Sequence, residues 1–253
     1  IPLFWVLLDK AGNSNARERT NLMGRLHEAF PDQPIASLSG DREFIGERWI
    51  SWLESQGIPF VLRLKENMHV WNENHVPVKL SVHAARLRKR NSRILKGTWY
   101  LGRDPLKATT PIKIAMMRLK TGEMLIVAAS RIRIKTALST YRNRWGIETL
   151  FSALKTRGLG LEDTHMTSPH KVTTLMAVLA IAFCLAYKSG LWVARIKPPR
   201  HKSHGRLQRS LFALGLNAFR KAIVKMSELE IRRYVVALFK PNIPRNALIG
   251  LVL

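Results

Sequence analysis

Residues 141–155 (YRNRWGIETLFSALK) combine an acidic side chain with cations at the spacing of a helix. At about 100° per residue, the polar members fall on a stripe roughly 60° wide. These members are Tyr141, Arg144, Glu148 and Lys155. A separate apolar face, which we expect to enter a core, consists of Ile147, Leu150, Phe151 and Leu154. A carboxylate is a ligand that Mg²⁺ prefers, but spacing alone favours a surface helix with an ordinary Arg144–Glu148 pair, worth about 0.3 kcal/mol.

The segments before this stripe alternate between strand patterns and helix patterns. In chain order we expect a buried strand at 1–8, a helix from a cap at Ser14 or Asn15 to about residue 30, a strand at 35–38, a helix at about 46–56 that buries Trp49, Ile50 and Leu53, and a strand at 59–65. Such alternation implies parallel pairing between the later strands. We therefore predict an α/β fold.

Asp41 follows the expected strand at 35–38, and open α/β sheets place their chemistry at such strand ends. Taken alone, this aspartate is better explained as a turn residue or a helix cap. Its position makes it a candidate site residue, and a second signal is needed to decide between these interpretations.

The composition indicates a polyanionic partner. The 253 residues include 42 Lys and Arg against 17 Asp and Glu, a formal charge of +25, and 46% of them are hydrophobic. Such an excess of charge is self-repelling without a polyanion, and the apolar share indicates a folded core. Nucleic acid is the leading partner. Basic runs at 84–96 and 195–209 are candidate contacts, although such runs are commonly solvated faces; the second is expected to be a linker.

Cys184 is the single cysteine, which excludes an internal disulfide and a cysteine-based zinc site. It lies in the apolar run at 172–187, which is shorter than the ~20 residues needed to span a bilayer. We therefore predict a buried helix with an inert thiol, and no membrane partner.

The polar stripe resembles the signature of a known family. Tyr141 is followed after two residues by Arg144, after three more by Glu148 and after six more by Lys155. This spacing is similar to that of the insertion-sequence-4 type of DDE transposase at all four positions. Trp145, beside the stripe, is expected to pack in the protein rather than to stack on a base.

A second motif resembles the same family. The sequence Gly-Asp-Arg-Glu-Phe at 40–44 is similar to the motif of the second catalytic aspartate. The catalytic metal ligands that the resemblance implies are Asp41 and Glu148. The DNA contacts that it implies are Tyr141, Arg144, Lys155 and, more weakly, Arg42.

The family has a ribonuclease-H-like fold, a mixed sheet flanked by helices, with an insertion before the last catalytic helix. The resemblance implies that 1–67 form the first part of the catalytic domain and 68–130 a mainly β insertion. It assigns 131–194 to the last catalytic helix and the buried helix of the catalytic domain. Residues 195–253 are expected to form the basic linker and C-terminal helices at 210–223 and 227–239.

The resemblance also implies an N-terminally truncated transposase. In that fold the first catalytic aspartate lies on the first strand and the second follows the fourth strand. If Asp41 follows the fourth strand, 1–8 form the third, and the first aspartate lies upstream of Ile1. Asp9 does not replace it, because only 31 residues, filled by one helix, separate it from Asp41.

The function implied is metal-dependent cleavage of DNA strands and transfer of the freed 3′-hydroxyl to target DNA. Such chemistry uses two Mg²⁺ ions about 3.5–4 Å apart, with Mn²⁺ as a substitute. The expected partners are double-stranded transposon ends, target DNA and a second copy of the chain, in the bacterial cytoplasm at the nucleoid. A DNA-binding remnant without catalysis and a structure-selective nuclease of the same fold are the alternatives.

Overall fold

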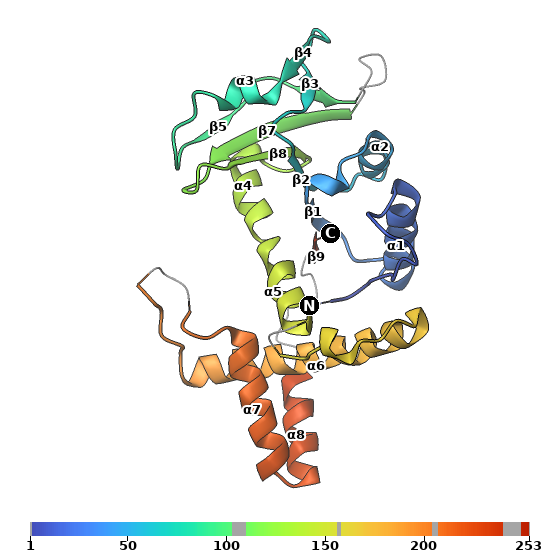
Figure 1. Ribbon diagram of the computed structural model, residues 1–253, viewed down its shortest axis with the longest axis vertical. Coiled ribbons are helices and arrows are strands. Elements are labelled where there is room, and N and C mark those ends of the chain that lie inside the picture. The colour runs from blue at the N-terminus through green and yellow to red at the C-terminus, as the bar shows by residue number, and fades with distance from the viewer. Residues whose placement is uncertain (1, 103–109, 156–157, 204–206, 240–248, 253) are drawn as a thin grey trace. The chain divides into compact units, whose positions relative to one another are not determined.

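The computed structural model describes residues 2–102, 110–155, 158–203, 207–239 and 249–252 (Figure 1). The chain divides into two units. We call residues 10–146 and 248–253 the sheet unit, and residues 1–9 and 147–247 the helical unit.

A nine-stranded mixed sheet forms the centre of the sheet unit. Its strands are β1 (Ile35–Gly40), β2 (Phe60–Leu64), β3 (His69–Trp71), β4 (Pro77–Lys79), β5 (Ser92–Ile94), β6 (Trp99–Leu101), β7 (Thr110–Arg118), β8 (Met124–Ser130) and β9 (Ile249–Val252). The strand order is β4-β3-β6-β7-β8-β2-β1-β9, and β5 pairs with β7. The predicted α/β class, a mixed sheet flanked by helices, is confirmed.

The two strands nearest Asp41 run parallel, as the strand–helix alternation predicted. β1 pairs with β2 in a register that places Gly40 opposite Leu62. The next strand, β8, is antiparallel to β2 and places Val127 opposite Arg63. Since β1 ends at Gly40, which lies opposite Leu62, Asp41 and Arg63 lie at the same end of these two strands.

Helices α1 (Ala16–Ala29) and α2 (Glu47–Ser55) match the predicted segments. Asn15 caps α1 through a capping box with Glu18, because each side chain hydrogen-bonds the backbone N–H of the other. The predicted core residues of α2 are confirmed, since Trp49, Ile50 and Leu53 are at most 1% exposed.

Helix α4 (Ile134–Arg142) covers one face of the sheet. Its Ala137 and Tyr141 pack against Val61, Val127 and Ala129. Side chains alternate along a strand, so Phe60 and Leu62 point to the other face, where they are fully buried. Figure 1 shows α4 and the α1–α2 pair on opposite sides of β1 and β2.

The segment expected to be an insertion, 68–130, contains six of these strands, β3 to β8, and one short helix, α3 (Leu80–Ala84). β7 and β8 belong to the central part of the sheet, because β8 pairs with β2. β3, β4, β5 and α3 were not predicted from the sequence.

The predicted strand at 1–8 is wrong for residues 2–8, which form neither strand nor helix. Leu3, Val6 and Leu7 are 44–47% exposed. The free edge of β1 is instead paired in parallel with β9, which the sequence did not predict. An apolar run needs an available strand edge to become a strand, and β9 takes up the edge of β1. The expectation that 1–8 form the third strand of the fold and that Asp41 follows the fourth is therefore not supported.

The prediction of one helix over 141–155 is also wrong. Helix α4 ends at Arg142, and α5 begins at Trp145. Around this break, the N–H groups of Asn143, Arg144 and Gly146 donate to carbonyls three residues back, at 3.0–3.1 Å. This is the pattern of a 3₁₀ turn. Asn143 and Gly146 are poor helix formers, which explains a tightened turn at this point.

The helical unit contains α5 (Trp145–Lys155), a short 3₁₀ turn η2 (Glu162–Thr164), α6 (Pro169–Ile196), α7 (Leu211–Lys225) and α8 (Glu228–Phe239). Of the predicted apolar face of α5, Leu154 is buried, whereas Phe151 is 47% exposed. The two predicted C-terminal helices are confirmed as α7 and α8. Part of the expected basic linker, residues 204–206, lies outside the described residues.

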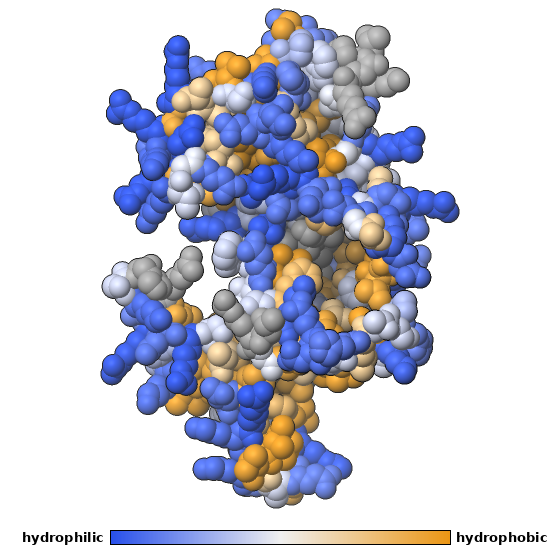
Figure 2. All heavy atoms as spheres, in the orientation of Figure 1, coloured by the Kyte–Doolittle hydropathy of each residue, from blue (hydrophilic) through white to orange (hydrophobic). Residues whose placement is uncertain are grey.

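Helix α6 is longer than predicted and only partly buried. It has 28 residues, and 33% of its most apolar 18-residue stretch is buried. Its length and composition would allow it to cross a membrane, but core helices of soluble proteins have the same length and composition. Burial raises the pKa of the Cys184 thiol, in keeping with the predicted inert cysteine. Apolar side chains are also exposed on α7 and α8, among them Val224 and Val236. Figure 2 shows an apolar patch at the lower end of these two helices.

The crossing of α6 and α7 depends on two glycines. A Cβ atom on Gly190 would lie 1.9 Å from the carbonyl oxygen of Leu211, and one on Gly215 would lie 1.7 Å from that of Ala186. No side chain fits at either position, because the two backbones are in direct contact.

Candidate active site

Asp41 stands at the carboxyl end of β1, in a turn that the local sequence fixes. Its side chain caps the 3₁₀ turn η1 (Arg42–Phe44) by accepting from the backbone N–H of Arg42 at 2.8 Å. The preceding Gly40 allows this turn to fold back, since a Cβ there would lie 2.9 Å from both Leu62 and Phe44. The sequence interpretation of Asp41 as a cap is therefore correct, and it does not exclude a second role.

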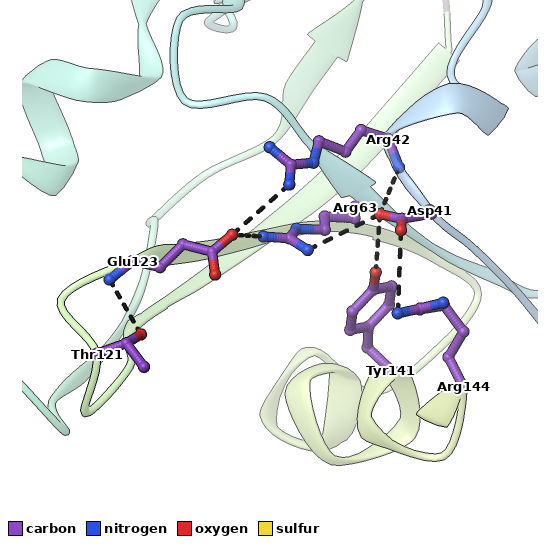
Figure 3. Close-up of polar contacts among 7 residues, drawn as sticks. All are labelled: Asp41, Arg42, Arg63, Thr121, Glu123, Tyr141 and Arg144. Carbon is purple, nitrogen blue, oxygen red and sulfur yellow. Dashed lines mark hydrogen bonds and ion pairs between the residues drawn. The ribbon is translucent and has the colours of Figure 1, made fainter. Parts of the chain in front are cut away.

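The carboxylate of Asp41 meets three further side chains that are remote in sequence (Figure 3). The hydroxyl of Tyr141 donates to Oδ1 at 3.3 Å across a sequence separation of 100 residues. Nη1 of Arg63 lies 3.9 Å from Oδ1, and Nη2 of Arg144 lies 3.9 Å from Oδ2. The side chains of Arg63 and Arg144 are 13% and 12% exposed, and that of Asp41 is 37% exposed. One accessible carboxylate is thus surrounded by two sheltered cations.

Helix α4 delivers Tyr141 to this position. Tyr141 lies one turn after Ala137, and both pack on the sheet against Val61. Burial raises the pKa of the Tyr141 hydroxyl above its ordinary value of 10.0, so at neutral pH it keeps its proton and acts as a donor. The guanidinium of Arg144 also lies over the Tyr141 ring, 5.4 Å from its centroid.

Arg63 and Glu123 belong to the same cluster, and the sequence did not single them out. Nη2 of Arg63 donates a short hydrogen bond to Oε1 of Glu123, and Nη2 of Arg42 lies 3.6 Å from the same oxygen. Nε of Arg63 is buried and has no hydrogen-bond partner among the described residues. Arg63 is the one charged residue of β2, which is otherwise apolar; this was the available signal. Glu123, in the turn between β7 and β8, carried no signal.

Arg19 of α1 holds the turn that carries Asp41. Its guanidinium is buried, donates to the carbonyl of Glu43 at 3.0 Å and lies over the Phe44 ring at 4.7 Å. These contacts connect α1 with η1, directly after Asp41. Arg19 is therefore a positioning residue that the sequence pattern did not reveal.

The remaining predicted site residues lie on α5, which belongs to the helical unit from Ile147 onward. Glu148 is in the first turn of α5 and Lys155 in the last. Nζ of Lys155 lies 3.0 Å from Oε1 of Glu162, and both side chains are about half exposed. Trp145 is 60% exposed, which contradicts the expectation that it packs in the protein.

Carboxylate oxygens are the ligands that Mg²⁺ prefers. Asp41 carries one carboxylate in the sheet unit, and Glu148 carries another on α5 of the helical unit. Within the described ranges, no group of three or more acidic, histidine or cysteine side chains is close enough to hold a metal ion.

Residues 2–185 match the model of the transposase DDE domain. This match covers most of the chain, and the protein belongs to the DDE transposase family. A comparison with curated proteins gave no match. The mixed sheet flanked by helices is consistent with the ribonuclease-H-like domain of such transposases.

Family membership gives the protein its broad class. It places the chain among enzymes of the nuclease and transposase type and indicates a role in DNA transposition. It also implies that the chain binds DNA, and enzymes of this family generally use divalent metals.

Proposed function

We propose that this chain carries out metal-dependent cleavage of DNA strands and strand transfer, as a transposase of the insertion-sequence-4 type. The observation that carries the proposal is the contact of Asp41 with Tyr141 and Arg144. Asp41 comes from one predicted motif, and Tyr141 and Arg144 come from the other, so two separate sequence signals converge on one carboxylate.

Each side chain of the cluster has a defined task in this proposal. Asp41 and Glu148 would each supply a carboxylate ligand to the metal, which would stabilise the charge on the attacking and leaving oxygens at phosphorus. Arg144 and Arg63 bind the oxygens of the phosphate, since a guanidinium presents five donors in a planar fork. Tyr141 donates one further hydrogen bond, because its hydroxyl is protonated at neutral pH.

The outer contacts complete the proposed DNA site. Arg42 is half exposed and lies at the edge of the cluster, beside Glu123. Lys155 contacts a phosphate after leaving Glu162, an exchange that costs little because exposed ion pairs contribute roughly 0–1 kcal/mol. The freed 3′-hydroxyl then attacks a phosphodiester of the target DNA, forming the new P–O bond while the target strand breaks.

The proposal extends to the assembly and to the third carboxylate. We propose that two copies of the chain act on two transposon ends in the bacterial cytoplasm, using Mg²⁺ or Mn²⁺. The expectation of a first catalytic aspartate upstream of Ile1 came from a strand count that the structure contradicts, so we retain it only as a proposal to be tested. A version extended upstream is therefore a necessary arm of any activity test.

Mg²⁺-dependent strand cleavage tests the proposal. The chain and a version extended upstream are incubated with duplexes that carry the transposon ends, each as wild type and as Glu148→Gln. Cleavage by a wild-type protein that disappears in Glu148→Gln supports the transposase. Tight, salt-sensitive DNA binding without cleavage in any protein would replace it with the alternative of a DNA-binding remnant.

A further inference from the structure

A second basic feature lies in the sheet unit, outside the Asp41 cluster. The segment between α3 and β5 surrounds a shallow, open hollow of about 590 Å³. Its lining residues are Arg86, Leu87, Arg88, Arg90, Asn91, Ser92 and Arg93. Figure 2 shows long hydrophilic side chains projecting over the region of α3 and β5, at the upper left.

Arg118 holds the backbone of the segment that lines this hollow. Its guanidinium donates to the carbonyls of Ala84, Leu87 and Gly122 at 2.6–3.0 Å. The backbone of Arg118 also exchanges hydrogen bonds with Arg90 and Asn91, at 2.7 and 3.1 Å. Arg90 itself is held at φ 68, in the left-handed region that few non-glycine residues adopt. The cations of the hollow therefore project from an ordered loop.

The hollow lacks the acidic partners that the Asp41 cluster has. Its lining contains four arginines and no Asp or Glu. Arg86, Arg88 and Arg90 are exposed and form no ion pair with any residue in the described part of the chain. Clustered like charges repel one another, and a bound polyanion relieves this repulsion.

The hollow adjoins the candidate active site through one turn. The turn between β7 and β8 contains Gly122 and Glu123. Cε of Lys89 lies 3.8 Å from the position of a Cβ on Gly122. The next residue, Glu123, contacts Arg63 and Arg42 of the Asp41 cluster. Basic side chains thus extend from the neighbourhood of Asp41, past this turn, to the hollow.

We propose that this hollow binds the phosphate backbone of duplex DNA on one side of the cleavage position, independently of sequence. The inference rests on the proposed function, and it assigns a surface for the DNA beyond the scissile phosphate. Duplex DNA carries one charge per about 1.7 Å of its axis, so a repeated anion matches a track of cations better than a single phosphate does. Arginines suit such contacts, because the guanidinium fork pairs with phosphate oxygens.

The salt dependence of DNA binding tests this assignment. The variant Arg86→Gln/Arg88→Gln removes two cations of the hollow, and Arg17→Gln/Arg48→Gln removes two exposed cations from α1 and α2. Binding of a duplex of arbitrary sequence is measured by fluorescence anisotropy across a salt series. We expect the hollow variant to bind about tenfold more weakly and its slope of log K against log[salt] to fall by roughly 1.8, at 0.9 per lost phosphate contact.

Two outcomes separate this inference from the proposed function. If wild type binds with a steep salt dependence while the hollow and control variants change equally, the hollow is a solvated face and the inference is overturned alone. If wild type shows no salt-dependent binding, the proposed function fails together with it. Unchanged thermal unfolding of both variants verifies that neither has lost its fold.

A crosslinking experiment provides an independent readout. Lys89→Cys in a Cys184→Ser background carries a photoreactive group at the edge of the hollow, and Arg48→Cys carries the same group on α2. The proposal predicts strong crosslinking to duplex DNA from position 89 and at least severalfold less from position 48. Equal yields from both positions would overturn it.

Discussion

Asp41 shows how a single carboxylate can serve two purposes. Its Oδ1 atom caps the turn after β1, and the same group faces Tyr141, Arg63 and Arg144. The nearest nitrogens of the two arginines are 3.9 Å from its oxygens, beyond hydrogen-bonding distance. The arginines therefore make the local electrostatic potential more positive without hydrogen-bonding to the carboxylate at these distances.

Glu123 lies where a DNA phosphate is expected, because it accepts from Arg63 and approaches Arg42. Glu123→Gln removes the negative charge that competes for these arginines. We expect this variant to bind DNA about threefold to tenfold more tightly at low salt, since an added phosphate contact becomes available. Anisotropy titrations check this expectation.

Glu28→Gln is the matched control, because Glu28 is an exposed acid of α1 with the same change in charge. A gain in affinity that is equal in both variants would reduce the effect to net charge. Weaker binding by Glu123→Gln would instead mean that Glu123 orients Arg63 for its DNA contact.

The ionisation of Tyr141 gives a prediction for alkaline pH. Burial raises the pKa of this hydroxyl above 10.0, so the folded protein favours the protonated form. The associated stabilisation is complete below the ordinary tyrosine pKa and is lost as pH rises through the raised value. Ultraviolet titration of tyrosinate should show one late-ionising group that is absent in Tyr141→Phe. If the group missing from Tyr141→Phe were one that ionises at the ordinary tyrosine pKa, the burial of Tyr141 would be contradicted.

Sequence reasoning found the residues of the cluster that belong to motifs and missed those that do not. Asp41, Tyr141 and Arg144 were all singled out, and the structure brings them together. Arg63 and Glu123 were missed because their roles depend on the pairing of β2, β7 and β8. Strand register of this kind is set by contacts between distant segments, which one sequence does not display.

The elements of the fold were predictable where local patterns and caps agree. The buried face of α2 is such a local feature and was predicted correctly. A cap at Ser14 or Asn15 was also predicted, and Asn15 is the residue that caps α1. The strand at 1–8 failed because strand formation depends on a free edge. The prediction of one helix over 141–155 was wrong because a periodic pattern of polar and apolar residues does not indicate a tightened turn at Asn143 and Arg144.

The crossing of α6 and α7 gives a prediction at the level of elements. Gly215→Ala places a methyl group 1.7 Å from the carbonyl oxygen of Ala186, so the two helices must separate. We expect a loss of roughly 3 kcal/mol in the free energy of unfolding, as for other overpacked positions. Urea denaturation followed by circular dichroism measures the change.

Gly24→Ala is the matched control for this substitution. Gly24 lies inside α1, and no heavy atom is within 4 Å of an added Cβ. We expect this variant to be more stable by about 0.5–1 kcal/mol, because alanine favours the helix over glycine. Equal stability of Gly215→Ala and wild type would show that α6 and α7 are not in backbone contact.

The molecule as a whole has a charge that suits a polyanionic partner. The formal charge is +25, and the acids of the Asp41 cluster lie among arginines. Membership of the DDE transposase family makes DNA that partner. In the proposed function, the net charge supplies sequence-independent affinity for DNA and the Asp41 cluster supplies the site of the chemistry.

Cleavage by Asp41→Asn tests the central claim most directly. The assay compares wild type, Asp41→Asn and the exposed control Asp32→Asn, in the chain and in a version extended upstream, on transposon-end DNA with Mg²⁺. We predict that Asp41→Asn lowers the cleavage rate at least about a hundredfold while DNA binding stays equal or tightens, because a metal ligand is lost and a negative charge is removed. Wild-type rates in Asp41→Asn, or equal losses in Asp41→Asn and Asp32→Asn, would contradict the account.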